Sequence, residues 1–398
     1  MNLSQRLAQI SPGGSNGREV FHRARALIAS GVAVADLTIG EHDIRTDPAI
    51  LAAMDASARG GHTGYSSVAG IPALRAEIAG RIATRTGVAT TPENIVVTAG
   101  GQAALFAAMF AIGAPGDACA FIDPYYVTYP GTIRSAGLVP RPIVTEARDG
   151  FLPRPEDLLA GTAGARGLLV NTPNNPTGAV YPDATLAGVA DAARAHDLWL
   201  ISDEVYDTQV WTDRHTSLRA LPDMAAHTLV VGSLSKSHAM TGSRLGWICG
   251  PEEAVAHIVN LFVHLTYGIP GFVQDAGLFA LQQGAPFEER IAAPFARRRA
   301  LVDAALARTS AVIGLPTQGA MYAMLDVRAT GLSGLAFAER LLEAERIAVM
   351  PGASFGAAAS GHVRVAMTID DAALADALAR LVRFAEAEAA AARTTAMS

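Results

Sequence analysis

The sequence contains little cysteine and little charge. Only Cys119 and Cys249 occur among its 398 residues, far apart and in no Cys-x-x-Cys pair. Two distant cysteines exclude a disulfide framework and a cysteine zinc site, and no metal site is predicted. We expect a reducing compartment such as the cytoplasm. Acidic residues outnumber basic ones by 37 to 31, so the net charge of −6 gives no footprint for nucleic acid or an anionic membrane.

Long hydrophobic runs are also missing. The longest charge-free stretch, residues 94–116, is interrupted by Gly100-Gly101-Gln102 and ends at Pro115-Gly116, so it predicts a strand, a turn and a buried helix instead of a membrane span. The N-terminal residues lack an apolar segment of signal-peptide length. Because half of the residues are hydrophobic and the chain is long enough for two domains, we expect a folded protein that binds small molecules.

Lysine is the scarcest basic residue. The 31 lysine and arginine residues include one lysine, Lys236. Arginine replaces lysine as a surface charge, but only a lysine amine forms a Schiff base or loses its proton at modest cost. Any amine chemistry in this chain therefore depends on Lys236.

Short apolar runs alternate with helical patterns through the middle of the chain. Helix-like segments such as 103–112 and 186–196 separate some of the runs, which is typical of βαβ units and a mainly parallel sheet. The predicted strands cover residues 95–98, 118–122, 167–171, 199–202, 228–232 and 245–249. The fold class predicted is α/β.

The pattern changes after about residue 270. Long helices such as 287–309 appear, with strand-like runs at 322–326 and 363–366 and an Ala-rich helical end at 385–398. This change predicts a second, smaller α+β domain. We expect a large domain over residues 46–280 and a small domain formed by residues 1–45 and 281–398.

Polar motifs follow several predicted strands, at the edge of the sheet where α/β proteins bind ligands. Gly100-Gly101-Gln102 separates a strand from a helix, so its backbone N–H groups could bind an anion such as phosphate. The segment from Asn171 to Gly178 is unusually rich in turn-forming residues. Asp203 lies near the end of a buried strand, where a carboxylate needs a cationic or hydrogen-bond donor partner.

The last of these motifs contains the lysine. Ser233, Ser235 and Lys236 follow the strand 228–232, and Arg244 lies eight residues further on. Two hydroxyls, an amine and a guanidinium suit a phosphorylated aldehyde, because the amine can condense with it while the other groups bind phosphate. A solvated lysine in a serine-rich turn is the alternative, and the scarcity of lysine argues against it.

These motifs, in this order, resemble the class I/II aminotransferases, which are pyridoxal-phosphate enzymes of fold type I, and in particular their prokaryotic aspartate aminotransferase branch. The matching stretches are Gly40-Glu41 with Asp43, Tyr65 with Gly70 and Leu74-Arg75, 98–102, 123–126, 174–178, 202–206, 233–236, 244–246 and 362–364. The resemblance implies a large domain with a mostly parallel seven-stranded sheet between helices, and pyridoxal 5′-phosphate as cofactor. It implies transfer of an amino group between an L-amino acid and a 2-oxo acid by a ping-pong mechanism.

The resemblance also implies catalytic roles. Lys236 would form the internal aldimine and, once released, shuttle a proton between the substrate Cα and the cofactor. Asp203 would keep the pyridine nitrogen protonated. Asn175 and Tyr206 would bind the phenolic oxygen, and Tyr126 would stack on the ring.

Further residues would bind the phosphate and the substrate. The phosphate ligands implied are the backbone amides of Gly100, Gly101 and Gln102 with Ser233, Ser235 and Arg244. Tyr65 would reach the phosphate of the partner subunit, which implies a homodimer with shared active sites. Arg364 would bind the substrate α-carboxylate as a bidentate pair, beside the Gly40 backbone and Asn175.

The chain departs from the family pattern at two positions. Enzymes for acidic substrates in this branch have a lysine after the glycine pair, where this chain has Gln102, so a neutral or aromatic donor is as well supported as aspartate. Arg18 or Arg45 could replace that lysine. His42 stands in place of the usual proline and faces either the pocket or solvent. Tyr267 either lines the neighbouring subunit's site or packs locally.

Three other functions are weighed against amino transfer. The segment 352–356 matches the Gly-x-Ser-x-Gly motif of serine hydrolases, but no histidine follows Asp370 or Asp371, so Ser354 is interpreted as a loop residue. A non-catalytic binding protein would be expected to have lost Lys236, Asp203 or Arg364, and all three are present. A C–S β-lyase uses the same residues and remains the alternative to an aminotransferase.

Overall fold

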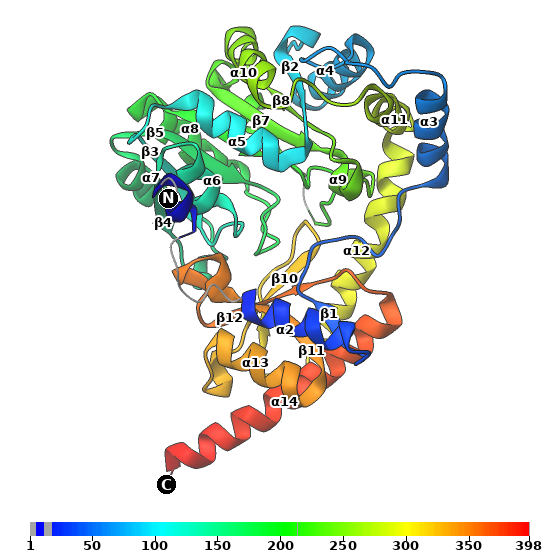
Figure 1. Ribbon diagram of the computed structural model, residues 1–398. Coiled ribbons are helices and arrows are strands. Elements are labelled where there is room, and N and C mark those ends of the chain that lie inside the picture. The colour runs from blue at the N-terminus through cyan, green and yellow to red at the C-terminus, as the bar shows by residue number, and fades with distance from the viewer. Residues whose placement is uncertain (1–4, 12–17, 213, 398) are drawn as a thin grey trace.

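The computed structural model describes residues 5–11, 18–212 and 214–397. It contains a seven-stranded and a five-stranded β-sheet, each with its own helices, and the long helix α12 (Gly284–Leu306) runs between them (Figure 1). The predicted α/β class with a second sheet is confirmed. The domain bounds at residues 46 and 280 stay a prediction, and the chain ends 1 and 398 lie outside the described residues.

The seven-stranded sheet has the order β2-β8-β7-β6-β5-β3-β4. Only β8 is antiparallel to its neighbours, β2 and β7, and the remaining pairs are parallel. All six predicted strands are confirmed within two residues at each end. The strands are β2 (Ile95–Thr98), β3 (Ala118–Asp123), β4 (Val139–Val144), β5 (Ala165–Asn171), β6 (Trp199–Asp203), β7 (Thr228–Ser233) and β8 (Gly246–Cys249).

The strand β4 was not predicted from the sequence. Its six residues include Pro140 and Pro142, which cannot donate to a neighbouring strand and do not fit the pattern of a central strand. The structure places β4 at the edge of the sheet, paired in parallel with β3 alone. Proline is tolerated there because one side of an edge strand needs no partner.

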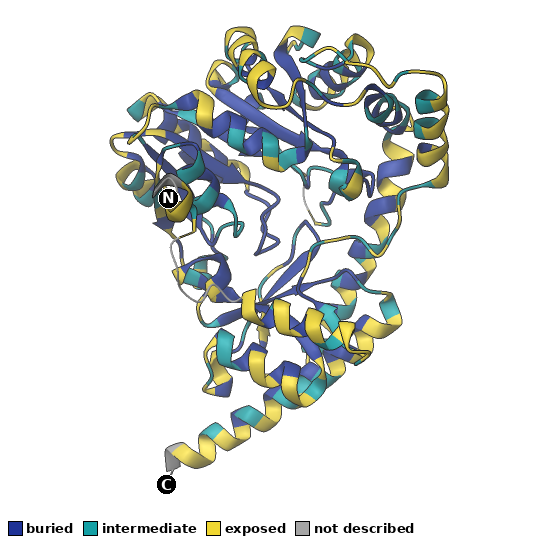
Figure 2. Ribbon diagram, in the orientation of Figure 1, coloured by how far each residue is buried: buried dark blue, intermediate teal, exposed yellow. Residues whose placement is uncertain are grey.

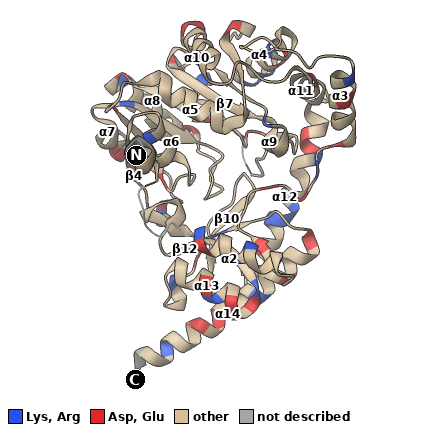
Figure 3. Ribbon diagram, in the orientation of Figure 1, with Lys and Arg blue, Asp and Glu red and all other residues tan. Residues whose placement is uncertain are grey.

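Helices cover both faces of this sheet, which explains its uninterrupted apolar strands (Figure 2). Phe121, Leu169 and Ile201 face one helical layer, whereas their neighbours Leu168 and Leu200 pack in the other. Charged residues lie mainly on the outer helices (Figure 3). The first layer contains α5 (Gly100–Ile112), α6 (Tyr129–Ser135) and α10 (Glu252–Leu265), and the second contains α7 (Pro155–Thr162) and α8 (Asp183–His196).

Three further helices cover the β2–β8 end of the sheet. The helices α3 (Pro48–Arg59), α4 (Pro72–Thr86) and α11 (Gly271–Leu281) enclose a core that includes Ile50, Leu74 and Val97. The predicted helices 103–112, 186–196 and 287–309 correspond to α5, α8 and α12, each of which begins three residues earlier than expected. Among the described residues, no helix combines the length and apolar character needed to cross a membrane.

The five-stranded sheet joins the two ends of the chain. Its order is β1-β11-β12-β10-β9, and β1 is parallel to β11 whereas the other pairs are antiparallel. Strands 322–326 and 363–366 were predicted, but β1, β9 and β11 were missed because they are too short or too uniformly apolar to show a period. The elements are α2 (Arg18–Ala29), β1 (Ala35–Leu37), β9 (Ile313–Gly314), β10 (Tyr322–Asp326), α13 (Gly334–Glu345), β11 (Ile347–Pro351), β12 (His362–Ala366) and α14 (Asp371–Met397).

Backbone approaches closely where β8 passes the start of α5. A Cβ atom added at Gly246 would lie 2.8 Å from the carbonyl carbon of Gly100 and 2.8 Å from the carbonyl oxygen of Gly232. Neither backbone atom can rotate away as a side chain would. Glycine at position 246 therefore fixes the distance between β8, β7 and the first turn of α5.

We predict that Gly246→Ala lowers the free energy of unfolding by about 1–3 kcal/mol, because the methyl group forces the backbone apart. Gly80→Ala is the matched control: Gly80 lies inside α4 with no atom near the added Cβ, so alanine should stabilise the helix by roughly 0.5–1 kcal/mol. Denaturant titrations of both variants at one protein concentration measure the two changes. Equal destabilisation by both would contradict the close approach at Gly246.

Candidate active site

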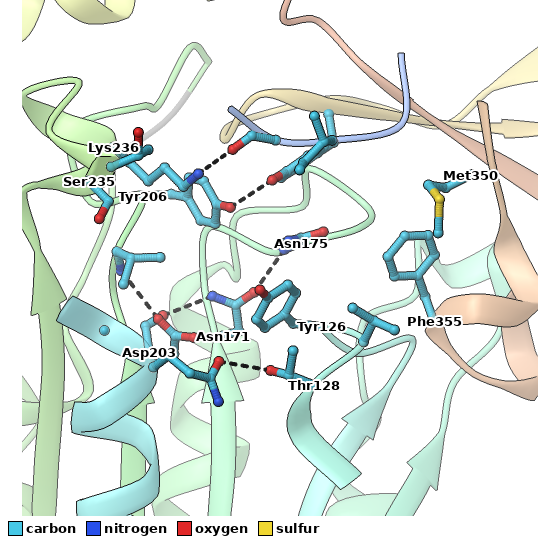
Figure 4. A pocket seen from close by; sticks show the side chains of 18 of the residues that line it. Tyr126, Thr128, Asn171, Asn175, Asp203, Tyr206, Ser235, Lys236, Met350 and Phe355 are labelled. Atoms are coloured by element: carbon cyan, nitrogen blue, oxygen red, sulfur yellow. Dashed lines mark hydrogen bonds between the residues drawn. The ribbon is translucent and has the colours of Figure 1, made fainter. Parts of the chain in front are cut away.

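A cavity of about 460 Å³ lies between the two sheets and is open to solvent. Its walls come from the ends of β5, β6 and β7, the start of α5, and residues of β10, β11 and β12 (Figure 4). Residues far apart in the sequence therefore meet in one place. The predicted site residues that line this cavity are Gly40, Gly101, Gln102, Tyr126, Asn175, Asp203, Tyr206, Ser233, Ser235, Lys236, Arg244 and Arg364.

Lys236 lies in the short helix α9 (Leu234–Ser237), directly after β7. Its Nζ donates a hydrogen bond to the backbone carbonyl of Gly40, and its side chain points into the cavity (Figure 4). Burial lowers the pKa of Lys236 below the usual lysine value. A lowered pKa increases the fraction of neutral amine, which is the form that acts as nucleophile or base.

Asp203 is the last residue of β6 and is only 3% exposed. The Tyr129 hydroxyl donates to its Oδ2 at 2.6 Å, and Asn171 Nδ2 donates to its backbone carbonyl at 3.0 Å. The expected donor partner is therefore present, although Tyr129 itself was not predicted because no spacing linked it to β6. Burial raises the pKa of Asp203 to about 6, so a nearby cation would stabilise its ionised form.

Three groups around the start of α5 form an anion cradle. Gly100 has a φ of +78°, and a Cβ there would lie 2.5 Å from Arg244 Nη2, so only glycine leaves room for the guanidinium. The Ser233 hydroxyl donates to Ser235 Oγ at 3.0 Å on the neighbouring turn. Helix N–H groups, a guanidinium and two hydroxyls at one helix start suit a phosphate dianion. Gly100 supports this cradle without lining the cavity.

The side chain of Gln102 is turned to α6 and the loop before it. Its Nε2 donates to Thr132 Oγ1 at 2.8 Å, and Thr128 Oγ1 donates to its Oε1 at 3.1 Å. Both ends of the amide are therefore engaged. The backbone N–H of Gln102, at the start of α5, has no intrahelical partner and is available to bind an anion.

Arg364 extends from β12 into the cavity and is buried. Its Nη1 donates to Asn175 Oδ1 at 2.8 Å, and its Nη2 donates to the backbone carbonyl of Thr38. The guanidinium lies over the rings of Tyr322 and Phe355, with Cζ 4.3 and 4.4 Å from their centroids. These contacts hold the planar group in one orientation, which is what bidentate binding of a carboxylate requires.

Tyr206 and Tyr322 approach each other from the two sheets. Their hydroxyl oxygens are 2.9 Å apart, and burial raises the pKa of Tyr206 well above the usual tyrosine value. Sequence reasoning found Tyr206 but missed Tyr322, because β10 was recognised only as a strand. Tyr126 also lines the cavity, from the loop that follows β3.

Tyr65 and His42 are absent from the described lining of this cavity. Tyr65 is 90% exposed and packs edge-on against Tyr267 at 5.1 Å, so it does not reach its own chain's cavity. His42 was expected to face the pocket or solvent; it is absent from the described lining of the cavity, and its side chain is only partly exposed. Its half-buried ring lies edge-on to Phe295, with Nε2 2.9 Å from the backbone carbonyl of Lys236.

Arg18 and Arg45, the two candidates to replace the family's lysine, differ in position. Arg18 lines the cavity from α2, with Phe21 and His22, whereas the exposed Arg45 is absent from its described lining. Ser354 lies buried in a 3₁₀ turn over residues 352–355, which agrees with its interpretation as a loop residue. The hydrolase motif therefore reflects a turn.

The chain matches the family model described as aminotransferase class I and II over residues 32–381. It is 38% identical to the arginine–pyruvate transaminase AruH of Pseudomonas aeruginosa, over 96% of this chain and 97% of that protein. It is 37% identical to the aspartate/prephenate aminotransferase of Thermus thermophilus, over 96% and 98%.

Solved structures agree with the sequence matches. The Thermus thermophilus aspartate aminotransferase with maleate superposes with a TM-score of 0.90 at 36% identity, over 96% of this chain and 99% of that chain. A tetra mutant of that enzyme complexed with tryptophan gives the same TM-score and coverage.

The lysine, the buried carboxylate and the anion cradle fit pyridoxal 5′-phosphate, the cofactor of this family. The relatives are named as aminotransferases, so the C–S lyase alternative is not favoured. Together, the full-length matches and the assembled site establish that this chain is a pyridoxal-phosphate-dependent enzyme that belongs to the class I and II aminotransferases.

Proposed function

We propose that this aminotransferase takes its amino group from a neutral L-amino acid with an apolar or aromatic side chain. The observation that carries the proposal is the cavity wall away from Lys236. There Met350 and Phe355 lie side by side, as Figure 4 shows, and Phe21, Ile39 and Val127 also line the cavity. An apolar donor side chain gains about 25 cal/mol for each Å² that it buries against such residues.

Charged donors are less well matched to this wall. Gln102 occupies the position of the lysine that binds distal carboxylates in related enzymes, and its amide is held by Thr128 and Thr132. A dicarboxylic donor would depend on Arg18 or His22 instead. For a cationic donor, Asp203 is the sole carboxylate among the described residues of the lining, and it is bonded to Tyr129.

The cofactor end of the site is divided among the groups already described. When bound, pyridoxal phosphate supplies an aldehyde that condenses with amines and a ring that accepts electrons from the substrate Cα. Asp203 would hold a proton on the ring nitrogen, and the start of α5, Ser233, Ser235 and Arg244 would bind the phosphate. Tyr126 would stack on the ring. Asn175, whose Oδ1 accepts from Arg364, would donate through Nδ2 to the phenolic oxygen together with Tyr206.

Lys236 is the base that moves the substrate proton. Its amine lies in the cavity beside the Gly40 carbonyl, and its lowered pKa favours the unprotonated form. Arg364 binds the substrate α-carboxylate and so orients Cα toward that amine. Hydrogen bonds to Gly40 hold the Lys236 amine, and hydrogen bonds to Thr38 and Asn175 hold the Arg364 guanidinium. The distance between the base and the bound substrate is therefore set before the substrate binds.

We also propose a homodimer and a cytoplasmic location. Tyr65 and Tyr267 form an exposed aromatic pair outside the chain's own cavity, as expected if Tyr65 completes the phosphate site of a partner subunit. Both cysteines are buried and form no disulfide, which is compatible with a reducing compartment. Sedimentation of the purified protein and cell fractionation test these two statements.

A panel of amino donors tests the proposed substrate class. We expect kcat/KM for L-leucine or L-phenylalanine to equal or exceed that for L-aspartate, with pyruvate or 2-oxoglutarate as acceptor. L-Glutamate and L-arginine complete the panel, and 2-oxo acid and ammonia are measured separately. A preference of more than about tenfold for aspartate or arginine, which is about 1.4 kcal/mol in transition-state binding, would contradict the apolar assignment.

Substitution of Arg364 tests carboxylate binding. Arg364→Ala should raise KM for every amino and 2-oxo acid about 10- to 100-fold, because each charged hydrogen bond contributes about 1.5–3 kcal/mol. Arg328→Ala is the matched control, since Arg328 forms an exposed ion pair with Asp326 next to the same sheet. Steady-state kinetics with two donors and two acceptors measure both variants. An unchanged KM for Arg364→Ala would contradict the role.

A further inference from the structure

The segment 38–43 crosses between the two sheets and is held at successive carbonyl groups. The Thr38 carbonyl accepts from Arg364 Nη2, and the Ile39 carbonyl accepts from Thr368 Oγ1 at 3.0 Å. The next carbonyl, that of Gly40, accepts from Lys236 Nζ. One short segment therefore contacts both the proposed carboxylate-binding arginine and the lysine.

The far end of the segment is anchored by a buried arginine. Arg298 of α12 binds both carboxylate oxygens of Asp43, at 2.9 and 2.6 Å. It also donates to Asp371 at 2.8 Å and to the Met367 carbonyl at 3.1 Å. Residue 42 therefore sits between a fixed carbonyl at Gly40 and a fixed carboxylate at Asp43.

His42 uses this position to contact the lysine backbone. Its Nε2 is 2.9 Å from the Lys236 carbonyl, so this nitrogen carries the proton and donates. Gln209 Nε2 also donates to that carbonyl, at the longer distance of 3.4 Å. The segment 38–43 thus holds Lys236 at two points, at the amine through Gly40 and at the backbone through His42.

The surroundings of His42 favour a neutral ring. Its Nδ1 is buried and has no hydrogen-bond partner among the described residues, and the ring packs edge-on against Phe295 at 5.2 Å. Burial lowers the pKa of His42 to about 4, and the Lys236 and Arg298 charges act in the same direction. The hydrogen bond to the Lys236 carbonyl and the Asp43 charge act in the opposite direction. A neutral ring presents a single N–H donor, and that donor is directed at Lys236.

We propose that His42 is a positioning residue that fixes the Lys236 backbone, so that the lysine amine stays aligned for proton transfer. The proposal rests on the proposed role of Lys236 as the base. His42 is absent from the described lining of the cavity, so its loss should slow proton transfer without weakening substrate binding. Substitution of His42 should therefore lower kcat and leave KM unchanged.

Holoenzyme variants separate the hydrogen bond from the packing of the ring. His42→Phe keeps an aromatic ring against Phe295 and removes the donor, whereas His42→Gln keeps an N–H donor without the ring. Loss of a hydrogen bond of about 0.5–1.5 kcal/mol corresponds to a rate change of about 2- to 12-fold. We expect His42→Phe to lower kcat about three- to tenfold with KM within about twofold, and His42→Gln to recover at least half of the rate.

An isotope effect and a control variant complete the test. With a donor deuterated at Cα, the isotope effect on kcat should increase in His42→Phe and return toward the wild-type value in His42→Gln. His362→Phe is the matched control, because His362 is also buried and edge-on to a phenylalanine, Phe151, but neither of its ring nitrogens has a hydrogen-bond partner among the described residues. We expect wild-type kcat from this control.

Each outcome bears on the proposal. A wild-type kcat for His42→Phe, or equal losses in His42→Phe and His42→Gln, would overturn it. If His42→Phe does not fold, His42→Gln is compared with His42→Asn. The amide nitrogen of asparagine corresponds to Nδ1 of histidine and does not reach the Lys236 carbonyl. Equal kcat values for these two variants would also overturn the proposal. Failure of the wild-type enzyme to transfer from any donor would instead contradict the proposed function.

Discussion

The site depends on keeping one amine out of bulk water while leaving it reactive. Lys236 lies where two sheets face each other, and its Nζ has a single carbonyl, that of Gly40, as its described hydrogen-bond partner. Burial lowers its pKa, and no carboxylate is bonded to it among the described contacts to restore the charged form. A lysine paired with an acid at this position would be a stable cation and a poor base.

Whereas the lysine amine must be neutral to react, the rest of the cavity must carry positive charge, because it has to attract anions. Arg244 lies at the start of α5 and Arg364 at the opposite wall, while Asp203 is the one carboxylate among the described lining residues. This arrangement separates a phosphate end from a carboxylate end, with the lysine between them. If Arg364 binds the α-carboxylate as proposed, a zwitterionic amino acid would present its amino group and Cα toward Lys236, and its side chain would meet the apolar wall of Met350 and Phe355.

Sequence reasoning predicted which residues gather in this cavity, because most of them follow strands. In a parallel sheet, the carboxyl ends of β5, β6 and β7 share one edge, so Asn175, Asp203 and Lys236 had to converge. Tyr129 and Tyr322 were missed because they lie within a helix and a strand of ordinary composition. The contact of His42 with Lys236 could not be predicted, since it depends on the path of a loop between two sheets. The strand β4 was missed for a related reason. Its two prolines are tolerated only at the edge of a sheet, and the sequence pattern does not show which strand lies at an edge.

Chemical trapping of the amine tests the central claim most directly. Borohydride reduction of the holoenzyme, followed by peptide mapping, should find the reduced cofactor covalently bound to Lys236, the sole lysine in the chain. Lys236→Ala should bind the cofactor reversibly and give no reduced adduct under the same conditions. An adduct that persists in Lys236→Ala, or that maps to the N-terminal amine in the wild type, would contradict the account.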